Sequence, residues 1–282
     1  MKILIADVLL AGKPNSDWKE GYVLKYAFEN LGHECIVAGP HAEISEVYIP
    51  EISKNYDLVI ISENYPAYSG WKWWNWSEVK IPKLFWAIDT HLVDYSPFVN
   101  GSNIDFVAFN NKCDMDKFNS NAKKIYMPYA VSKKHYDIEF NEPKKYDTTF
   151  IGGMTQDRES YINRFNIKHI SAFGADYVKE MKRSRICFNR SISHDLNAKY
   201  FEIIGSGTFM LTNKNDSFLE IVDNNESINK MIYNDDEDLR AKIDYYLKNE
   251  DEREYHAKIA KDYIFENHSF ESRAKLILNN VL

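Results

Sequence analysis

The chain has 282 residues, a length that fits one large domain or two small ones. Hydrophobic residues make up 44% of it, which is enough for a folded core and too much for a disordered chain. The formal net charge of −7 argues against a protein whose main task is to grip DNA or RNA, although a local groove can still be basic. Because no run approaches the ~20 apolar residues of a membrane span and residues 1–10 lack a signal-peptide pattern, we expect a cytoplasmic protein.

The first half of the chain predicts a parallel sheet. A strand over residues 2–8, a helix over 18–31 and a strand over 34–38 form one strand–helix–strand unit, with Gly32 suited to end the helix. Further strands are predicted at 56–62, 83–88, 105–109 and 124–127. These runs are continuously apolar rather than alternating, as a sheet covered on both faces requires.

The polar stretch 132–145 is the predicted linker, and a second alternating set follows it. The predicted elements are strands at 148–151, 167–172, 185–189 and 208–212, helices at 157–165, 175–182 and 197–204, and charged helices from residue 236 onward. The sequence therefore predicts two doubly wound α/β domains, 1–140 and 141–282. Ligands of such sheets bind at the carboxyl ends of the strands, and the cleft between the domains is the expected site.

Neither a disulfide framework nor a metal site is indicated. Cys35, Cys113 and Cys187 are odd in number and far apart, so we expect buried thiols. The acidic run 235–238 is more typical of the first turn of a helix, where the helix dipole favours negative charge, than of metal ligands.

Residues 189–213, NRSISHDLNAKYFEIIGSGTFMLTN, are the most informative segment. Glu202 lies in an apolar patch, where a carboxylate needs a partner, and a sugar diol would satisfy it. Gly205 and Gly207 permit close approach of the backbone, and Thr208 offers a hydroxyl and an N–H to a phosphate. The alternative is that Glu202 pairs with a neighbouring lysine and that the glycines only make a turn.

This segment resembles the donor-binding motif of GT-B glycosyltransferases, especially the CgeB-like group related to family 1 glycosyl transferases. The residues that carry the resemblance are Asn189, Lys199, Phe201, Glu202, Gly205, Gly207 and the strand 209–212. Residues 146–153 followed by Arg158 are similar to the start of the second domain of that family, and residues 238–278 are similar to its C-terminal helices.

The resemblance implies a GT-B-type α/β fold, in which two Rossmann-like doubly wound domains face each other across a cleft. Residues 1–140 would form the acceptor domain, and residues 141–282 the donor domain with its closing C-terminal helices. The implied reaction moves a sugar from a nucleotide-diphosphate sugar, most of all a UDP-sugar, to a hydroxyl acceptor. The nucleotide-sugar is a co-substrate, and neither a metal ion nor another cofactor is implied.

The resemblance also implies roles for individual residues of the donor site. Glu202 would hold the ribose hydroxyls, while Lys199 and Arg158 would lie near the diphosphate and stabilise charge on the departing nucleotide. Gly207 and Thr208 would offer backbone near the sugar or phosphate.

Two further positions belong to the implied donor site. Asn189 ends the strand of the motif. His194 stands where many related retaining enzymes have a second glutamate, which leaves the stereochemical outcome and the donor open. Lys199 replaces the more usual arginine and so keeps the charge without the bidentate geometry.

Asp89 and His91 directly follow the strand 83–88, where polar side chains are well placed for catalysis. Either could act as general base on an acceptor hydroxyl if the reaction inverts configuration. The alternative is that Asp89 caps the next loop and that His91 is exposed.

Two segments are candidates for the acceptor side. Gly12 and Lys13 follow the first strand, in a loop that lacks both glycine-rich phosphate-binding patterns. Trp71, Trp73 and Trp74 belong to an aromatic segment that either stacks on sugars or bases or covers the edge of the sheet.

The acceptor stays open at this point: a glycan, a small molecule, a protein or a hydroxymethylated base in phage DNA, for which residues 179–190 offer a basic strip. A dinucleotide-dependent oxidoreductase or epimerase is the alternative enzyme class, but the glycine-rich fingerprint after the first strand is absent. A non-catalytic sugar-nucleotide-binding protein is the third interpretation, which the His194 substitution leaves open.

Overall fold

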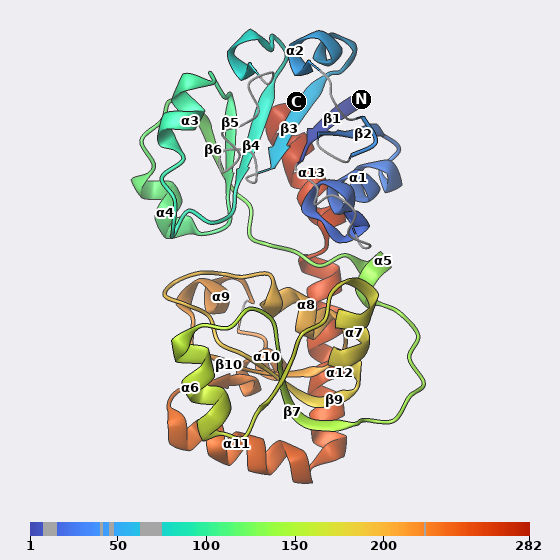
Figure 1. Ribbon diagram of the computed structural model, residues 1–282, viewed down its shortest axis with the longest axis vertical. Coiled ribbons are helices and arrows are strands. Elements are labelled where there is room, and N and C mark those ends of the chain that lie inside the picture. The colour runs from blue at the N-terminus through green and yellow to red at the C-terminus, as the bar shows by residue number, and fades with distance from the viewer. Residues whose placement is uncertain (8–15, 40–41, 45–47, 63–74, 223) are drawn as a thin grey trace. The chain divides into compact units, whose positions relative to one another are not determined.

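The computed structural model describes residues 1–7, 16–39, 42–44, 48–62, 75–222 and 224–282. The chain forms two compact units: unit 1 comprises Met1–Pro128 and Phe270–Leu282, and unit 2 comprises Tyr129–Ser269 (Figure 1). Each unit is a parallel sheet with helices, as the predicted fold class requires. Among the helices of the described residues, none is both long enough and apolar enough to cross a membrane.

Unit 1 contains a six-stranded parallel sheet in the order β2-β1-β3-β4-β5-β6. Its strands are β1 (Lys2–Ala6), β2 (Glu34–Ala38), β3 (Leu58–Ser62), β4 (Lys83–Ala87), β5 (Phe106–Phe109) and β6 (Lys123–Tyr126). Its helices are α1 (Glu20–Asn30), α2 (Ile49–Ile52), α3 (Ser96–Gly101), α4 (Lys112–Lys117) and α13 (Phe270–Val281), with 3-10 turns η1 (Ser16–Trp18), η2 (Ser53–Asn55) and η3 (Trp76–Glu78).

The sheet of unit 1 is buried on both faces, which explains the continuously apolar strands. Leu4, Val59 and Phe85 belong to one core cluster. Trp86 follows Phe85 in β4 and therefore points to the opposite face, where its ring lies 6.0 Å from that of Phe270 in α13. Helix α13 also packs against α1, so the C-terminal helix covers this second face (Figure 1).

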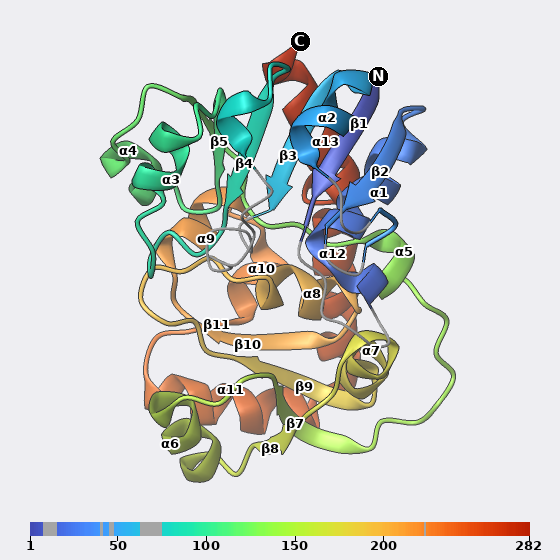
Figure 2. The ribbon, with the colours of Figure 1, turned by 45° about the horizontal axis from the view of Figure 1, so that its top comes forward.

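Unit 2 contains a five-stranded parallel sheet in the order β11-β10-β9-β7-β8, with β7, β9 and β10 side by side (Figure 2). Its strands are β7 (Tyr146–Ile151), β8 (Lys168–Ile170), β9 (Ser184–Asn189), β10 (Phe209–Asn213) and β11 (Ile232–Tyr233). Its helices are α5 (Lys133–Tyr136), α6 (Gln156–Arg164), α7 (Gly174–Lys182), α8 (Lys199–Gly205), α9 (Asp216–Ile221), α10 (Glu226–Lys230), α11 (Asp236–Lys248) and α12 (Glu250–Asn267). Asp235 caps α11, since its Oδ1 accepts from the N–H of Asp238 at 2.8 Å, which is the predicted role of this acidic run.

The direction in which the strands are added reverses once in each sheet. The reversal lies between β1 and β3 in unit 1 and between β7 and β9 in unit 2. The connections that leave the two central strands run to opposite sides at such a switch point, which is where open parallel sheets bind ligands. The residues that follow these four strands are therefore the first places to look for a site.

The predicted linker belongs to unit 2, so the units divide the chain differently from the predicted domains 1–140 and 141–282. Val131 forms a β-bridge with Ser269, and a Cβ on Gly205 of α8 would lie 2.6 Å from Val131 Cγ2. Tyr136 in α5 is buried as well. The polar residues of 132–145 suggested a linker, but the two contacts of Val131 and the burial of Tyr136 fix this segment in unit 2.

Helix α13 was predicted to close the second domain, and it packs instead in unit 1. The side chain of Arg273 is buried and its Nε donates to the carbonyl oxygen of Pro128 at 2.7 Å. Burial lowers the pKa of Arg273 to about 10. Helix α13 thus fixes the position of Pro128, the last residue of the first segment of unit 1.

The packing of α13 predicts a contrast between two neighbouring positions. Ala274 is fully buried and Lys275 is exposed. We expect Ala274→Asp to lower the free energy of unfolding by about 3–5 kcal/mol, since it leaves a buried carboxylate without a partner. Lys275→Asp is the control and should change it by less than about 0.5 kcal/mol. Urea unfolding followed by tryptophan fluorescence measures both, and equal effects would contradict the placement of α13.

Candidate active site

Three of the predicted donor-site residues, Arg158, Lys199 and Glu202, lie near the switch point of the sheet in unit 2. Gly152 and Gly153 directly follow β7, and Arg190 directly follows β9, its neighbour in the sheet. Arg158, from α6, joins the two strand ends: Nη1 donates to the carbonyl of Gly153 at 3.0 Å, and Nε and Nη2 both donate to the carbonyl of Arg190 at 3.1 Å. Its guanidinium therefore lies where such sheets bind ligands.

Arg158 is a partly buried cation. Its own N–H donates to the capping oxygen Thr155 Oγ1 at 3.3 Å, and its guanidinium carbon lies 5.5 Å from the centre of the Phe150 ring. Burial lowers the pKa of Arg158, while the charges of Asp195 and Asp157 act in the opposite direction. An anion bound at this position would restore the solvation that the guanidinium has lost.

Lys199, the first residue of α8, brings a second cation to the same place. Its Nζ donates to the hydroxyl of Tyr177 at 3.2 Å, and a Cβ on Gly152 would lie 2.5 Å from this Nζ. Gly152 also has φ = 149°, so a glycine supplies both the backbone conformation and the space. Burial lowers the pKa of Lys199; the charge of Glu202 opposes this, and the positive charge of Arg158 adds to it.

Glu202 lies three residues further along α8 and is half-buried. Its Oε1 accepts a hydrogen bond from the hydroxyl of Tyr136 at 2.8 Å, and its Oε2 accepts one from the hydroxyl of Tyr177 at 2.9 Å. Burial raises the pKa of both tyrosines well above the usual value, and the charge of Glu202 raises it further. The two phenols were missed by the sequence reasoning, because one lies in the predicted linker and the other in an ordinary amphipathic helix.

The glycine turn after α8 is a helix cap. Gly207 has φ = 79°, and its N–H donates to the carbonyl of Ile204 at 2.9 Å. The N–H of Thr208 donates to the carbonyl of Ile203 at 3.4 Å, which completes a Schellman motif. Thr208 is buried and its hydroxyl donates to the carbonyl of Met181 at 2.9 Å. Gly207 and Thr208 were predicted to offer backbone to a phosphate or sugar. In the structure their N–H groups and the Thr208 hydroxyl already donate to carbonyl oxygens of unit 2.

Asn189 and His194 are the remaining predicted donor-site residues. Asn189 is buried at the end of β9, where its Nδ2 donates to Thr212 Oγ1 at 3.2 Å and so braces β9 against β10. His194 is half-buried in the loop before α8, with its Nδ1 3.2 Å from Ser193 Oγ. Neither side chain takes part in the hydrogen bonds described above for the two cations and Glu202.

Asp89 and His91 follow β4 at the carboxyl edge of the sheet in unit 1. The N–H groups of Leu92 and Val93 donate to the carbonyl of Asp89 at 2.9 and 3.1 Å and close a tight turn. Both candidate bases are half-buried. A pocket of about 280 Å³ adjoins the turn, and its lining residues are Thr90, His91, Leu92, Val93, Asp94, Asp114, Lys117 and Phe118.

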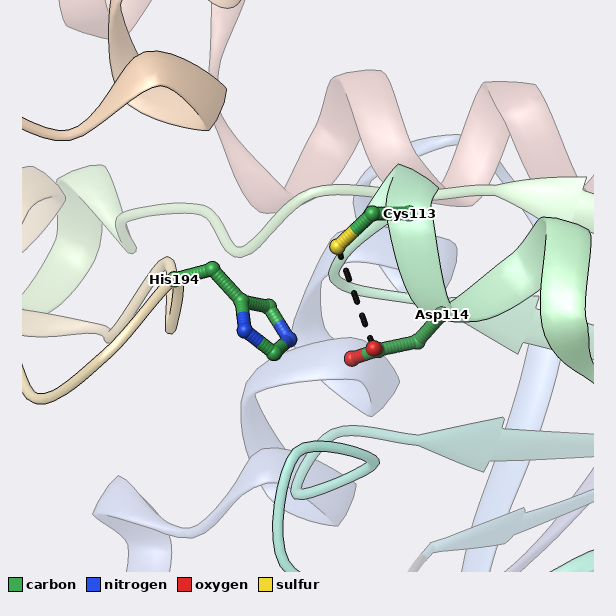
Figure 3. A group of neighbouring side chains, drawn as sticks. All are labelled: Cys113, Asp114 and His194. Carbon is green, nitrogen blue, oxygen red and sulfur yellow. Dashed lines mark hydrogen bonds between the residues drawn. The ribbon is translucent and has the colours of Figure 1, made fainter.

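Helix α4 forms part of the wall of this pocket. Thr90 Oγ1 donates to Asp114 Oδ2 at 2.7 Å, and Cys113 Sγ donates to Asp114 Oδ1 at 3.8 Å (Figure 3). Cys113 is half-buried, in contrast to the predicted burial, whereas Cys35 and Cys187 are buried as predicted. Burial raises the pKa of Cys35 to about 12 and that of Cys187 to about 11, so both are inert thiols at neutral pH.

A buried carboxylate marks the switch point of unit 1. Asp7, only 1% exposed, follows β1 directly. Its Oδ1 accepts from the hydroxyl of Ser62 at the end of β3 (2.9 Å), and its Oδ2 accepts from the N–H of Gly21 in the first turn of α1 (2.8 Å). A Cβ on Gly21 would lie 2.5 Å from Asp7 Oδ2. The sequence reasoning missed this residue, although a carboxylate at the end of an apolar strand was a usable signal.

The predicted acceptor-side residues lie outside the described residues. They are Gly12, Lys13, Trp71, Trp73 and Trp74. Trp76, at the end of the same aromatic segment, is 2% exposed and belongs to the core of unit 1. The roles of the other five stay predictions.

The predicted basic strip 179–190 is largely neutralised by ion pairs. Arg183 pairs with Glu142 at 2.6 Å and with Glu180 at 2.5 Å, and Arg185 pairs with Asp147 at 2.5 Å. Arginines that are held in ion pairs attract a polyanion less strongly than unpaired arginines do.

Part of the chain is similar to a known protein family. Residues 144–279, slightly less than half of the chain, match the family described as glycosyl transferase-like. A search of curated proteins by sequence gives no match.

Solved structures that resemble the chain over its whole length include several glycosyltransferases. The DNA-modifying enzyme β-glucosyltransferase, studied with its substrate uridine diphosphoglucose, has a TM-score of 0.69 at 15% identity, covering 100% of this chain and 99% of that one. HepE of Anabaena, in complex with UDP and glucose, has a TM-score of 0.67 at 10% identity, with coverage of 100% and 99%. Sucrose-phosphate synthase from Thermosynechococcus elongatus has a TM-score of 0.65 at 11% identity, with coverage of 99% and 98%. These likenesses confirm the predicted GT-B fold class.

Lys182 of α7 gives a test of the electrostatics of unit 2. Burial, together with the charge of Lys261, lowers the pKa of Lys182 to about 8. The folded state therefore disfavours the charged lysine below pH 8, and this cost disappears as the pH rises toward the ordinary value near 10.5. We expect Lys182→Met to raise the free energy of unfolding by about 1–3 kcal/mol at pH 7 and by much less at pH 10.

Chemical unfolding at the two pH values measures this difference. Lys179→Met, on the same helix, is the matched control and should be neutral at both. If Lys182→Met raises the free energy of unfolding by the same amount at pH 7 and pH 10, the increase comes from apolar packing and not from removal of the charge.

Proposed function

Since its C-terminal half is a glycosyl transferase-like domain and its fold is of the GT-B type, we propose that this protein is a glycosyltransferase that uses a UDP-sugar. The donor class is suggested by two of the similar structures, one studied with uridine diphosphoglucose and one in complex with UDP and glucose. In the proposed reaction, the bond between the anomeric carbon and the β-phosphate oxygen breaks. A bond from an acceptor hydroxyl oxygen to the same carbon forms, the hydroxyl proton passes to a base, and UDP leaves.

The observation that carries this proposal is the pair of desolvated cations at the switch point of unit 2. The positive charge of Arg158 lowers the pKa of Lys199, so the Lys199 ammonium is repelled by the nearby guanidinium. A diphosphate would relieve this repulsion and supply the missing counter-charge. As the bond to the sugar breaks, negative charge grows on the β-phosphate, and fixed positive groups stabilise this change most. We therefore propose that Arg158 and Lys199 do here what a divalent ion does in metal-dependent transferases.

Glu202 suits the ribose of such a donor. Its carboxylate is half-buried on α8, the helix that also carries Lys199. The phenols of Tyr136 and Tyr177 each occupy one oxygen, and each carboxylate oxygen can accept a second hydrogen bond. A pair of neighbouring hydroxyls fits this acceptor pair, as an acidic residue does for ribose in dinucleotide-binding sheets.

We propose that Asp89 or His91 acts as the base in unit 1. Both follow β4 at the carboxyl edge of its sheet, and His91 lines the pocket of about 280 Å³. The acceptor is proposed only as a hydroxyl compound. The net charge of −7 and the ion pairs of Arg183 and Arg185 favour a glycan or another small acceptor over DNA, although the similar structures include a DNA-modifying enzyme and an α-glucosyltransferase in complex with DNA.

The donor proposal predicts a ligand-dependent stability. We expect UDP to raise the melting temperature of the wild type, because a ligand at a hundredfold excess over its Kd stabilises the native state by ~2.7 kcal/mol. Glu202→Gln should weaken UDP binding by about 10–100-fold, since hydrogen bonds to a charged group contribute ~1.5–3 kcal/mol. Glu237→Gln, exposed on α11, is the control and should leave binding unchanged.

A thermal-shift screen with UDP, ADP, GDP and NAD, each with and without EDTA, makes this measurement. Stabilisation by UDP that persists in EDTA supports a metal-independent transferase. Stabilisation by NAD alone would contradict the proposed donor and favour the oxidoreductase alternative. No sugar transfer from any UDP-sugar despite UDP binding would support the non-catalytic alternative.

The proposed base can be found by steady-state kinetics. Replacement of the true base, in Asp89→Asn or His91→Gln, should lower kcat by about 10²–10⁴-fold and leave the donor KM nearly unchanged. Asp116→Asn, exposed on α4, is the matched control. If both variants keep the wild-type kcat, neither residue is the base.

A further inference from the structure

We infer that Tyr136 and Tyr177 are positioning residues that aim the Glu202 carboxylate at the two ribose hydroxyls of the donor. This inference rests on the proposed function and extends it to two residues that no sequence motif includes. Its basis is the pair of hydrogen bonds that the two phenols donate, one to each oxygen of the same carboxylate.

Tyr136 and Tyr177 together form a clamp on Glu202, and its geometry leaves the carboxylate little freedom to rotate. Tyr136 comes from α5 and Tyr177 from α7, so the two donors approach from separate segments of unit 2. The O···O distances are 2.8 and 2.9 Å, and both tyrosines are buried. A carboxylate held by one bond still turns about its terminal torsion, which has a broad energy profile. Two bonds, one on each oxygen, fix the carboxylate plane before any ligand arrives.

The clamp also decides which hydrogen bonds remain for a ligand. An ionised carboxylate only accepts, and each of its oxygens can accept two bonds. With one bond on each oxygen taken by a phenol, one position on each oxygen stays available, and Glu202 is only half-buried. Two hydroxyls on adjacent carbons present two donors at a matching spacing. A ligand without these hydroxyls gains nothing from the arrangement.

The phenols keep their protons under all ordinary conditions. Burial raises the pKa of Tyr136 and of Tyr177 well above the usual value, and the charge of Glu202 adds to this. Both tyrosines are therefore permanent donors, and the direction of each hydrogen bond is fixed.

Tyr177 also accepts a hydrogen bond from the neighbouring cation. Lys199 Nζ donates to the Tyr177 hydroxyl oxygen at 3.2 Å, and the same hydroxyl donates to Glu202. A cation on the oxygen polarises the O–H group and strengthens its donated bond. Tyr177 thus connects the cation proposed for the diphosphate to the carboxylate proposed for the ribose. Removal of the Tyr177 hydroxyl should therefore affect both the ribose side and the diphosphate side of the donor site.

The competing explanation is that the phenols only satisfy a partly buried carboxylate. In that case their loss would destabilise unit 2 and would weaken every nucleotide ligand to the same extent. Selectivity between ligands with and without ribose hydroxyls separates the two explanations, because a merely structural change does not alter it.

The experiment compares UDP with 2′,3′-dideoxy-UDP by isothermal titration calorimetry at pH 7.5. The variants are Tyr136→Phe and Tyr177→Phe, which keep the ring and remove only the hydroxyl. Tyr246→Phe is the control, because Tyr246 is a buried tyrosine of α11 that packs against Phe209. Thermal unfolding of each protein without ligand reports its stability.

We expect the wild type and Tyr246→Phe to prefer UDP to the dideoxy compound by at least about tenfold, as two hydrogen bonds to a charged group allow. In Tyr136→Phe this preference should fall by about 3–10-fold, with binding of the dideoxy compound unchanged. In Tyr177→Phe the preference should fall similarly, and binding of the dideoxy compound should also weaken.

Three outcomes would overturn the inference, and each has a different meaning. If the wild type does not bind UDP, the proposed donor is wrong and the inference fails with it. If the wild type prefers UDP but the phenylalanine variants keep the full preference, the donor proposal stands and the tyrosines do not position Glu202. If a variant loses both ligands equally, its tyrosine is structural. Because each phenol serves its own oxygen, one folded variant is enough to decide.

Discussion

The binding chemistry proposed for unit 2 depends on two partly buried cations that are held by neutral partners. Arg158 and Lys199 lie at the switch point of the sheet, and within the part of the chain that the structure describes no carboxylate is bonded directly to either charged group. Backbone carbonyls accept hydrogen bonds from the Arg158 guanidinium, and the Tyr177 hydroxyl accepts one from the Lys199 ammonium. Neutral partners of this kind hold a cation in place without cancelling its charge. The surrounding fold therefore keeps a positive potential available for an anion.

Much of this arrangement follows from local patterns in the sequence. The apolar strands predicted the parallel sheets, because strands buried on both faces carry few polar residues. The spacing of Lys199 and Glu202 along one helix placed both side chains on adjacent turns of the same face. Arg158, in the helix that follows β7, reaches the switch point because a parallel sheet brings the ends of its strands to one edge.

The features that escaped prediction depend on contacts between distant segments. Tyr136 lies 66 residues before Glu202, in a stretch whose polar composition resembles a linker. The donors of Thr208 appear free in the sequence, and only the packed helix shows that carbonyl groups of unit 2 already accept from them. Helix α13 is amphipathic, as α11 is. Which of two sheets such a helix covers is decided by the shape of both surfaces, and the pattern carries no information about that choice.

The return of α13 to unit 1 has a consequence for synthesis on the ribosome. Unit 2 is one continuous segment, whereas unit 1 needs Phe270–Leu282 to cover its second face. Domains fold as units while the chain emerges, usually from the N-terminus. Here the order is inverted: residues 1–128 cannot complete their core until residues 270–282, which are made after unit 2, are available. The face of the sheet that carries Trp86 lacks the Phe270 ring throughout the synthesis of unit 2, so unit 1 completes its fold only after unit 2 has been made.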